Sequence, residues 1–410
     1  MFRLICWDYR FLRYLRSIFL ILILAGACVG CVHRQSVTEP YPRWGKEFEI
    51  NSQQSNSDPL IVRMVHPEDL QQAKACLLLV HGMNEYIGRY AEVAHFFAKN
   101  FLVAGFDLYG HGLSNPALRR ADLALIAGAE KQEISDAYLA QIPLQNLDRL
   151  RESLDLALHQ LISLCDEQGL AAKPIFVVSH SLGSLITASY FLQNADNPVY
   201  AKRVAGMVFL GPAFAVSELP GWRGWFANPL IKLSFHAEEH FLNPHDESFP
   251  LRIANQAIAL LVVPILDGIF EILSWPGLRS LFTPTTPDWV VNYLTDDQQE
   301  RAQIRADGWF IRQTLLRYVK GIEGEIVIFR RQMAAFNSPY YLVYSAHDPI
   351  TASWGNRDFA QVTLHNHLDN QILAYPELNH HEHLFSAEPL RHEIFEKIQQ
   401  WLEWRLSQWQ

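Results

Sequence analysis

The stretch IFVVSHSLGS (residues 175–184) decides the fold. Its first four residues, IFVV, form a short apolar run typical of a buried strand. The pentapeptide SHSLG (179–183) follows, and a helical stretch then extends to about Gln193. Strand, tight turn and helix in this order are the context of a nucleophile elbow.

The geometry of this turn restricts which residues can occupy each of its positions. A sharp strand-to-helix turn needs small residues two positions before and two after the nucleophile. Gly183 meets this need, and Ser179 stands where the usual pattern has Gly but is still small. The turn lifts the hydroxyl of Ser181 above the sheet, at a helix N-terminus where the amide of Leu182 can stabilise an oxyanion. The sequence therefore predicts Ser181 as a nucleophile.

Short apolar runs alternate with amphipathic stretches on both sides of this motif. The runs lie at 59–67, 76–80, 101–107, 204–210, 340–345 and 371–375. This rhythm predicts an α/β protein whose mostly parallel sheet is covered by helices on both faces. Ligand sites in such sheets lie at the carboxyl ends of the strands, where the motif loops fall.

A nucleophilic serine needs a base and an orienting acid, which in this chain order follow the serine. Asp348 stands just after the run at 340–345. The loop PELNHHEHLF (376–385) follows the next run and offers three candidate bases, His380, His381 and His383. One of the three is expected to be the base, and the others to be surface or helix-start histidines.

A second oxyanion donor is expected upstream. The run CLLLV (76–80) ends at His81-Gly82, a turn that usually presents the backbone N–H of the next residue, here Met83. The glycines and histidine of FDLYGHGLS (106–114) are interpreted as structural loop packing.

The rhythm of strands and helices breaks between residues 212 and 338. This interval is rich in tryptophan and phenylalanine, and its most apolar stretch, 253–275, is interrupted by Pro264, Asp267 and Glu271. Such a stretch is a poor membrane span. We therefore expect a helical cap at 212–338, inserted between two parts of one core, 46–211 and 339–410.

The N-terminus has the pattern of an export signal. Four arginines precede SIFLILILA (17–25), which is too short to span a bilayer comfortably, and AGACVGC (25–31) then resembles the lipobox of bacterial lipoproteins. By this resemblance 1–28 is a signal peptide, Cys28 (alternatively Cys31) carries lipid, and 29–45 is a tether. The protein is then held at a membrane of the bacterial cell envelope; an uncleaved signal anchor is the alternative.

The composition argues against some classes of binding partner. The 410 residues carry a formal charge of −9, and no basic stripe follows the first residues, so nucleic-acid binding is not expected. Apolar residues make up 49% and charged residues 19%, as in a globular protein with a sizeable core. Cys76 and Cys165 are expected to be buried small hydrophobes rather than a disulfide, and no cysteine spacing suggests a zinc site.

Four segments together resemble the monoacylglycerol lipase and lysophospholipase branch of the α/β-hydrolases, which carries the serine aminopeptidase S33 name. They are HGMNEYIGRY (81–90), FDLYGHGLS (106–114), SHSLGS (179–184) and HEHLFSAEPLR (381–391). The resemblance implies an α/β-hydrolase fold with a large helical cap. It also implies ester cleavage through an acyl-enzyme, with Ser181, Asp348 and His381 as the triad and no metal or organic cofactor.

The aromatic-rich cap and the expected membrane tether suit a long acyl chain. The expected substrate is therefore a monoacylglycerol or lysophospholipid. A short-chain esterase or an aminopeptidase on the same scaffold remains an alternative, as does a non-catalytic lipoprotein that binds lipid.

Overall fold

The structure is a computed structural model. It describes residues 36–50, 59–134, 147–217, 249–273, 288–311 and 316–409, together with 228, 229 and 233. The expected signal peptide (1–28) and both candidate lipidation sites, Cys28 and Cys31, lie outside the described residues.

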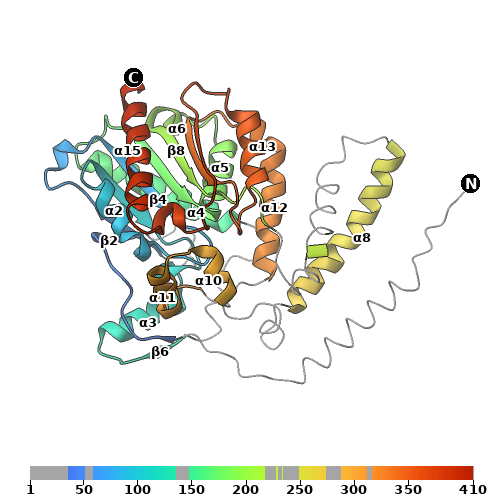
Figure 1. Cartoon of the computed structure of the whole chain (residues 1–410), viewed down its shortest axis with the longest axis horizontal. Coiled ribbons are helices and arrows are strands. Elements are labelled where there is room, and N and C mark those ends of the chain that lie inside the picture. The colour runs from blue at the N-terminus through green and yellow to red at the C-terminus, as the bar shows by residue number, and fades with distance from the viewer. Residues whose placement is uncertain are drawn as a thin grey trace, which may run out of the picture.

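An eight-stranded sheet forms the centre of the molecule (Figure 1). Its strand order is β10-β9-β8-β7-β4-β5-β3-β2, parallel from β10 to β5 and antiparallel at β3 and β2. The strands are β2 (Lys46–Ile50), β3 (Leu60–Val65), β4 (Ala75–Val80), β5 (Phe101–Phe106), β7 (Ile175–His180), β8 (Val204–Leu210), β9 (Tyr340–Ser345) and β10 (Gln371–Tyr375). The prediction of a mostly parallel α/β sheet is confirmed.

Helices cover both faces of the sheet because alternate residues of the buried strands point into separate cores. On β4, Cys76 and Leu78 enter one cluster, whereas Leu77 and Leu79 enter the other. The first core is covered by α3 (Pro116–Ile126), α4 (Asp148–Glu167), α5 (Leu182–Gln193), α6 (Pro198–Arg203), α12 (Leu316–Gln332) and α13 (Ser353–Thr363). The second is covered by α2 (Ala91–Phe97) and α15 (Leu390–Gln408).

The interval expected to be a cap is mostly helical where it is described. It contains α8 (Phe249–Leu273), α10 (Asp288–Leu294), α11 (Gln298–Ala306) and α12. Helix α8 contacts α12 and stands to the side of the sheet (Figure 1). Several large apolar residues of α8 are exposed: Ile253, Leu260, Leu261, Ile265 and Ile272. None of the helices in the described ranges combines the length and apolar character needed to cross a bilayer.

The described part of the expected tether, 36–45, is packed onto the domain, which corrects that prediction. Strand β1 (Ser36–Val37) pairs with β6 (Gln132–Glu133), and Tyr41 and Trp44 are buried. The hydroxyl of Tyr41 donates to the carboxylate of Asp107 at 2.8 Å. Large aromatic residues within this polar segment bury enough surface to hold it in place.

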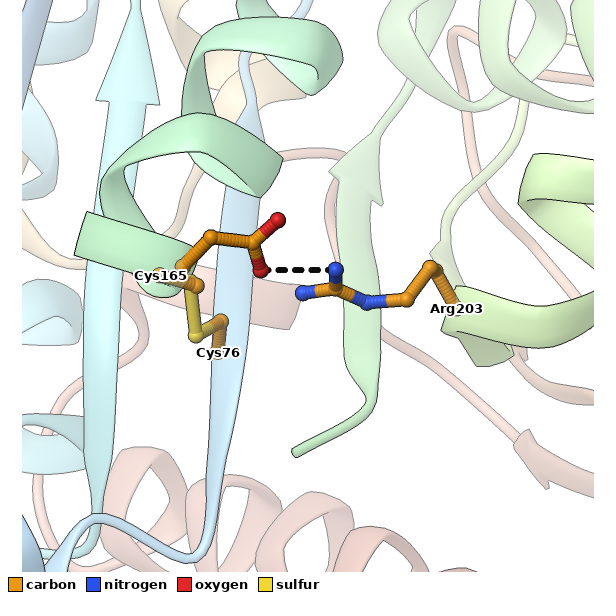
Figure 2. The surroundings of a disulfide bond; sticks show 4 residues. Cys76, Cys165 and Arg203 are labelled. Carbon is orange, nitrogen blue, oxygen red and sulfur yellow. Dashed lines mark hydrogen bonds and ion pairs between the residues drawn. A yellow bond between two sulfur atoms is a disulfide. The ribbon is translucent and has the colours of Figure 1, made fainter. Parts of the chain in front are cut away.

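Cys76 and Cys165 form a disulfide, contrary to the expectation of two free buried thiols (Figure 2). The bond joins β4 to α4, which pack against each other within the first core. An ion pair between Arg203 and Asp166 lies beside it, with 2.7 Å between nitrogen and oxygen. A cross-link between residues 89 positions apart restricts the unfolded chain and stabilises the fold by about 4.6 kcal/mol in the chain-entropy model.

Candidate active site

Ser181 lies in the tight turn between β7 and α5. Its backbone has φ 52° and ψ −121°, a left-handed conformation that non-glycine residues seldom adopt. Gly183 is required here, because a Cβ at this position would lie 2.4 Å from the carbonyl oxygen of His81. The hydroxyl of Ser179 donates to the carbonyl of Val208 at 3.2 Å, so the serine in place of glycine is accommodated with a partner. The turn thus has the strained shape that raises a serine above the sheet.

Three side chains from separate loops meet at this turn. The Nε2 atom of His380 lies 2.7 Å from Oγ of Ser181, and its Nδ1 atom lies 2.9 Å from Oδ2 of Asp348. Because a carboxylate only accepts, Nδ1–H donates to Asp348 and Nε2 accepts the serine proton. All three residues are buried. The carboxyl ends of β7, β9 and β10 bring these loops together.

The base expected from the resemblance, His381, does not face Ser181. Its Nε2 atom lies 2.8 Å from Oε1 of Glu85, and burial lowers the pKa of His381 to about 3. His383 also points elsewhere, because its Nδ1 donates to the carbonyl of His380 at 3.0 Å. The position beside the serine hydroxyl belongs to His380, so the assignment of His381 is corrected.

The acid is held by the turn that follows β9. One oxygen of Asp348 accepts from the amides of Ile350 and Thr351 at 2.8 and 2.9 Å. Burial raises the pKa of Asp348, but the adjacent His380 outweighs this and holds that pKa well below its usual range. Asp348 is therefore an anion that can orient the imidazole and stabilise its protonated form.

The two expected oxyanion donors come from segments that lie beside Ser181. Leu182 is the first residue of α5, where amides have no partner within the helix. Gly82 lies against the serine, since a Cβ there would be 3.0 Å from Cβ of Ser181, and Met83 follows it in the same loop. The role of Met83 and Leu182 as oxyanion donors stays a prediction.

A buried carboxylate supports this loop, and the sequence analysis gave it no role. Oε2 of Glu85 accepts from the amide of Gly82 at 3.1 Å and from the hydroxyl of Tyr90 at 2.7 Å. Nδ1 of His180 approaches the same oxygen at 3.4 Å, while its Nε2 donates to the carbonyl of His380 at 3.1 Å. The only sequence signal for this group was its place in the segment HGMNEYIGRY.

The fold is shared with several solved hydrolases. A monoglyceride lipase of Saccharomyces cerevisiae is similar with a TM-score of 0.58 and 14% identity, over 89% of this chain and 98% of that one. A carboxyl esterase of Bacillus coagulans is similar with a TM-score of 0.56 and 16% identity, over 89% of this chain and 100% of that one. For a monoacylglycerol lipase of Paleococcus ferrophilus the TM-score is 0.51 and the identity 16%, over 85% of this chain and 98% of that one. At such identities the likeness shows the fold alone.

No curated protein matches the chain in sequence at a significant level. The family model Hydrolase_4, described as serine aminopeptidase S33, matches residues 71–385, which is most of the chain and includes the turn at Ser181, the acid and the base loop. The chain is therefore an α/β-hydrolase that belongs to the serine aminopeptidase S33 family.

Proposed function

We propose that this protein is a serine hydrolase that cleaves carboxylic esters with Ser181 as nucleophile, His380 as base and Asp348 as orienting acid. One observation carries the proposal: a single buried imidazole lies within hydrogen-bond distance of both the serine hydroxyl and the carboxylate. A strained serine paired with a buried base is the arrangement that activates a weak nucleophile.

The mechanism follows from these contacts. Oγ of Ser181 attacks the ester carbonyl while Nε2 of His380 takes its proton, and the amides of Met83 and Leu182 receive the developing oxyanion. His380 then gives the proton to the leaving alcohol, which yields an acyl-enzyme. Water activated by the same imidazole releases the acid and restores the serine.

The proposed substrate is an ester with a long acyl chain, a monoacylglycerol or a lysophospholipid. Helix α8 supports this choice, because the exposed apolar residues on it offer a surface for a long hydrocarbon chain. Esters of this type carry one acyl chain on a small polar head group, and they present that chain in micelles or membranes.

The proposed location is the bacterial cell envelope, with the chain held at a membrane through Cys28 (alternatively Cys31). The lipobox-like segment at 25–31 motivates this location. The disulfide between Cys76 and Cys165 supports it, because disulfides persist in oxidising compartments such as the bacterial periplasm.

Hydrolysis of p-nitrophenyl esters with acyl chains of about two to eighteen carbons tests the function. We expect kcat/KM to rise towards long chains and Ser181→Ala to lower kcat by about 10⁴ or more, as other triad deletions do. A fluorophosphonate probe should label the wild-type protein but not Ser181→Ala.

Three other outcomes would each contradict a different part of the proposal. A sharp preference for acetate esters would reject the lipid substrate while leaving the esterase intact. Faster cleavage of aminoacyl p-nitroanilides than of any ester would favour an aminopeptidase. Absence of fluorophosphonate labelling would leave only a non-catalytic lipid-binding protein.

A further inference from the structure

The base loop is attached to the end of the insertion by its own backbone. The amide of His380 donates to the carbonyl of Tyr293 at 3.1 Å, and the amide of His381 donates to that of Leu294 at 2.7 Å. These carbonyls belong to the last turn of α10, where a helix leaves its carbonyl oxygens without internal partners. The residue that touches the serine is therefore placed partly by a helix of the insertion.

A single carboxylate reinforces this attachment. Oε1 of Glu382 accepts from the amide of Asp296 at 2.7 Å and from the hydroxyl of Thr295 at 3.4 Å. Its Oε2 accepts from the amide of Asn379 at 2.8 Å, and the amide of Glu382 donates back to the carbonyl of Asn379 at 3.0 Å. This reciprocal pair closes the turn 379–382, which contains His380. The carboxylate thus joins the turn that carries the base to the turn that follows α10.

The same part of the insertion reaches the oxyanion loop. The amide of Ile311 donates to the carbonyl of Asn84 at 2.9 Å, next to Met83. Arg89, which lies 3.5 Å from Glu85, forms an ion pair with Glu300 of α11. Residues 288–311 therefore contact both loops between which the ester carbonyl has to fit.

We propose that Glu382 is a positioning residue, which sets His380 against Ser181 by fixing the base loop to the turn after α10. This inference rests on the proposed function. Proton transfer depends steeply on geometry, and a shift of about 1 Å in a reacting group can cost a hundredfold in rate. The carboxylate of Glu382 accepts charge-assisted hydrogen bonds from the amide of Asp296, after α10, and from that of Asn379, in the base loop. Such bonds are strong enough to resist this shift.

The test replaces Glu382 by Gln, which keeps the size but leaves one acceptor oxygen where two amides need one each. We expect kcat to fall between about 10- and 100-fold while KM for the best p-nitrophenyl ester changes less than about twofold, because Glu382 bonds residues 295, 296 and 379 rather than the serine. Rates are normalised to active sites titrated with a fluorophosphonate, so that unfolded protein does not count. Glu377→Gln, an exposed change in the same loop, is the control and should leave kcat unchanged.

A second variant covers the case in which Glu382→Gln does not fold. Thr295→Val removes the hydroxyl that donates to this carboxylate and also accepts from the amide of Asp297. We expect a two- to fivefold loss of kcat per active site, about the worth of one hydrogen bond. In the double variant the losses should not add, because both changes act through one group.

If both Glu382→Gln and Thr295→Val turn over at the wild-type rate per titrated site, Glu382 has only a structural role, whatever its effect on melting temperature. If instead the wild-type protein neither labels nor hydrolyses esters, the proposed function has failed, and that result is separate from the behaviour of the variants.

Discussion

Two adjacent histidines of the base loop have different partners and therefore different expected roles. His380 contacts both Ser181 and Asp348, whereas His381 contacts Glu85. We expect His380→Ala to lower kcat/KM by about 10⁴ or more, because it removes the proton acceptor. His381→Gln keeps a donor for Glu85 and should lose less than about tenfold.

Steady-state kinetics on one p-nitrophenyl ester, with circular dichroism to verify folding, makes this comparison. Equal losses in the two variants, or a larger loss in His381→Gln, would show that the imidazole beside the serine in this structure is not the working base.

The sequence could predict two members of the site and not the third. Ser181 and Asp348 each follow an apolar strand directly, so the end of the strand fixes where they stand. The base lies in a longer loop with three histidines within four positions, all of them buried. Which imidazole turns towards the serine depends on the partners of the other two. His383 bonds the carbonyl of His380 within the loop, whereas Glu85 is brought to His381 only by the fold.

The disulfide between β4 and α4 makes the proposed export testable. We expect Cys76 and Cys165 to resist alkylation in protein recovered from the cell envelope, because an oxidising compartment forms and keeps the disulfide. In a variant that lacks residues 1–31 and stays in the cytosol, Cys76 and Cys165 should both be alkylated after denaturation. Mass spectrometry of the peptides that contain these two cysteines measures their alkylation.

Cys76→Ser with Cys165→Ser is the matched control, since it removes both thiols and should leave no label in these two peptides in either compartment. Two free thiols in the envelope protein would contradict the proposed location. They would leave the fold itself in place, because the buried apolar residues of β4 and α4 do not need the cross-link in order to meet.

Strands were predictable where they are continuous apolar runs, whereas β2 and the disulfide were not. The runs of β4, β5, β7, β8 and β9 have this composition because these parallel strands are buried on both faces. Strand β2 carries Lys46, Glu47 and Glu49 at the edge of the sheet, so its composition resembles that of a linker. The disulfide escaped prediction because nothing in the spacing of Cys76 and Cys165 shows that a strand and a helix place them in the same core.

For the whole molecule, the buried histidines link stability to pH. Burial lowers the pKa of His111 and of His381 to about 3, and that of His383 to about 4. Each titrates near 6.5 in the unfolded chain, so between pH 6.5 and about 4 the unfolded state binds protons that the folded state does not. The free energy of unfolding therefore falls as the pH drops below about 6.5, by up to about 1.4 kcal/mol per pH unit for each histidine.

Urea unfolding at pH 7.5, 6.0 and 5.0 measures this slope. We expect the midpoint to decrease steadily over that range, whereas Asp348, whose folded pKa is held below its unfolded value, adds its loss only at lower pH. His111→Gln removes one of the three groups and should flatten the slope, while His95→Gln changes an exposed residue and should not. A midpoint that stays constant from pH 7.5 to 5.0 would mean that the folded protein takes up protons at these histidines, and a neutral His381 beside Glu85 would then be excluded.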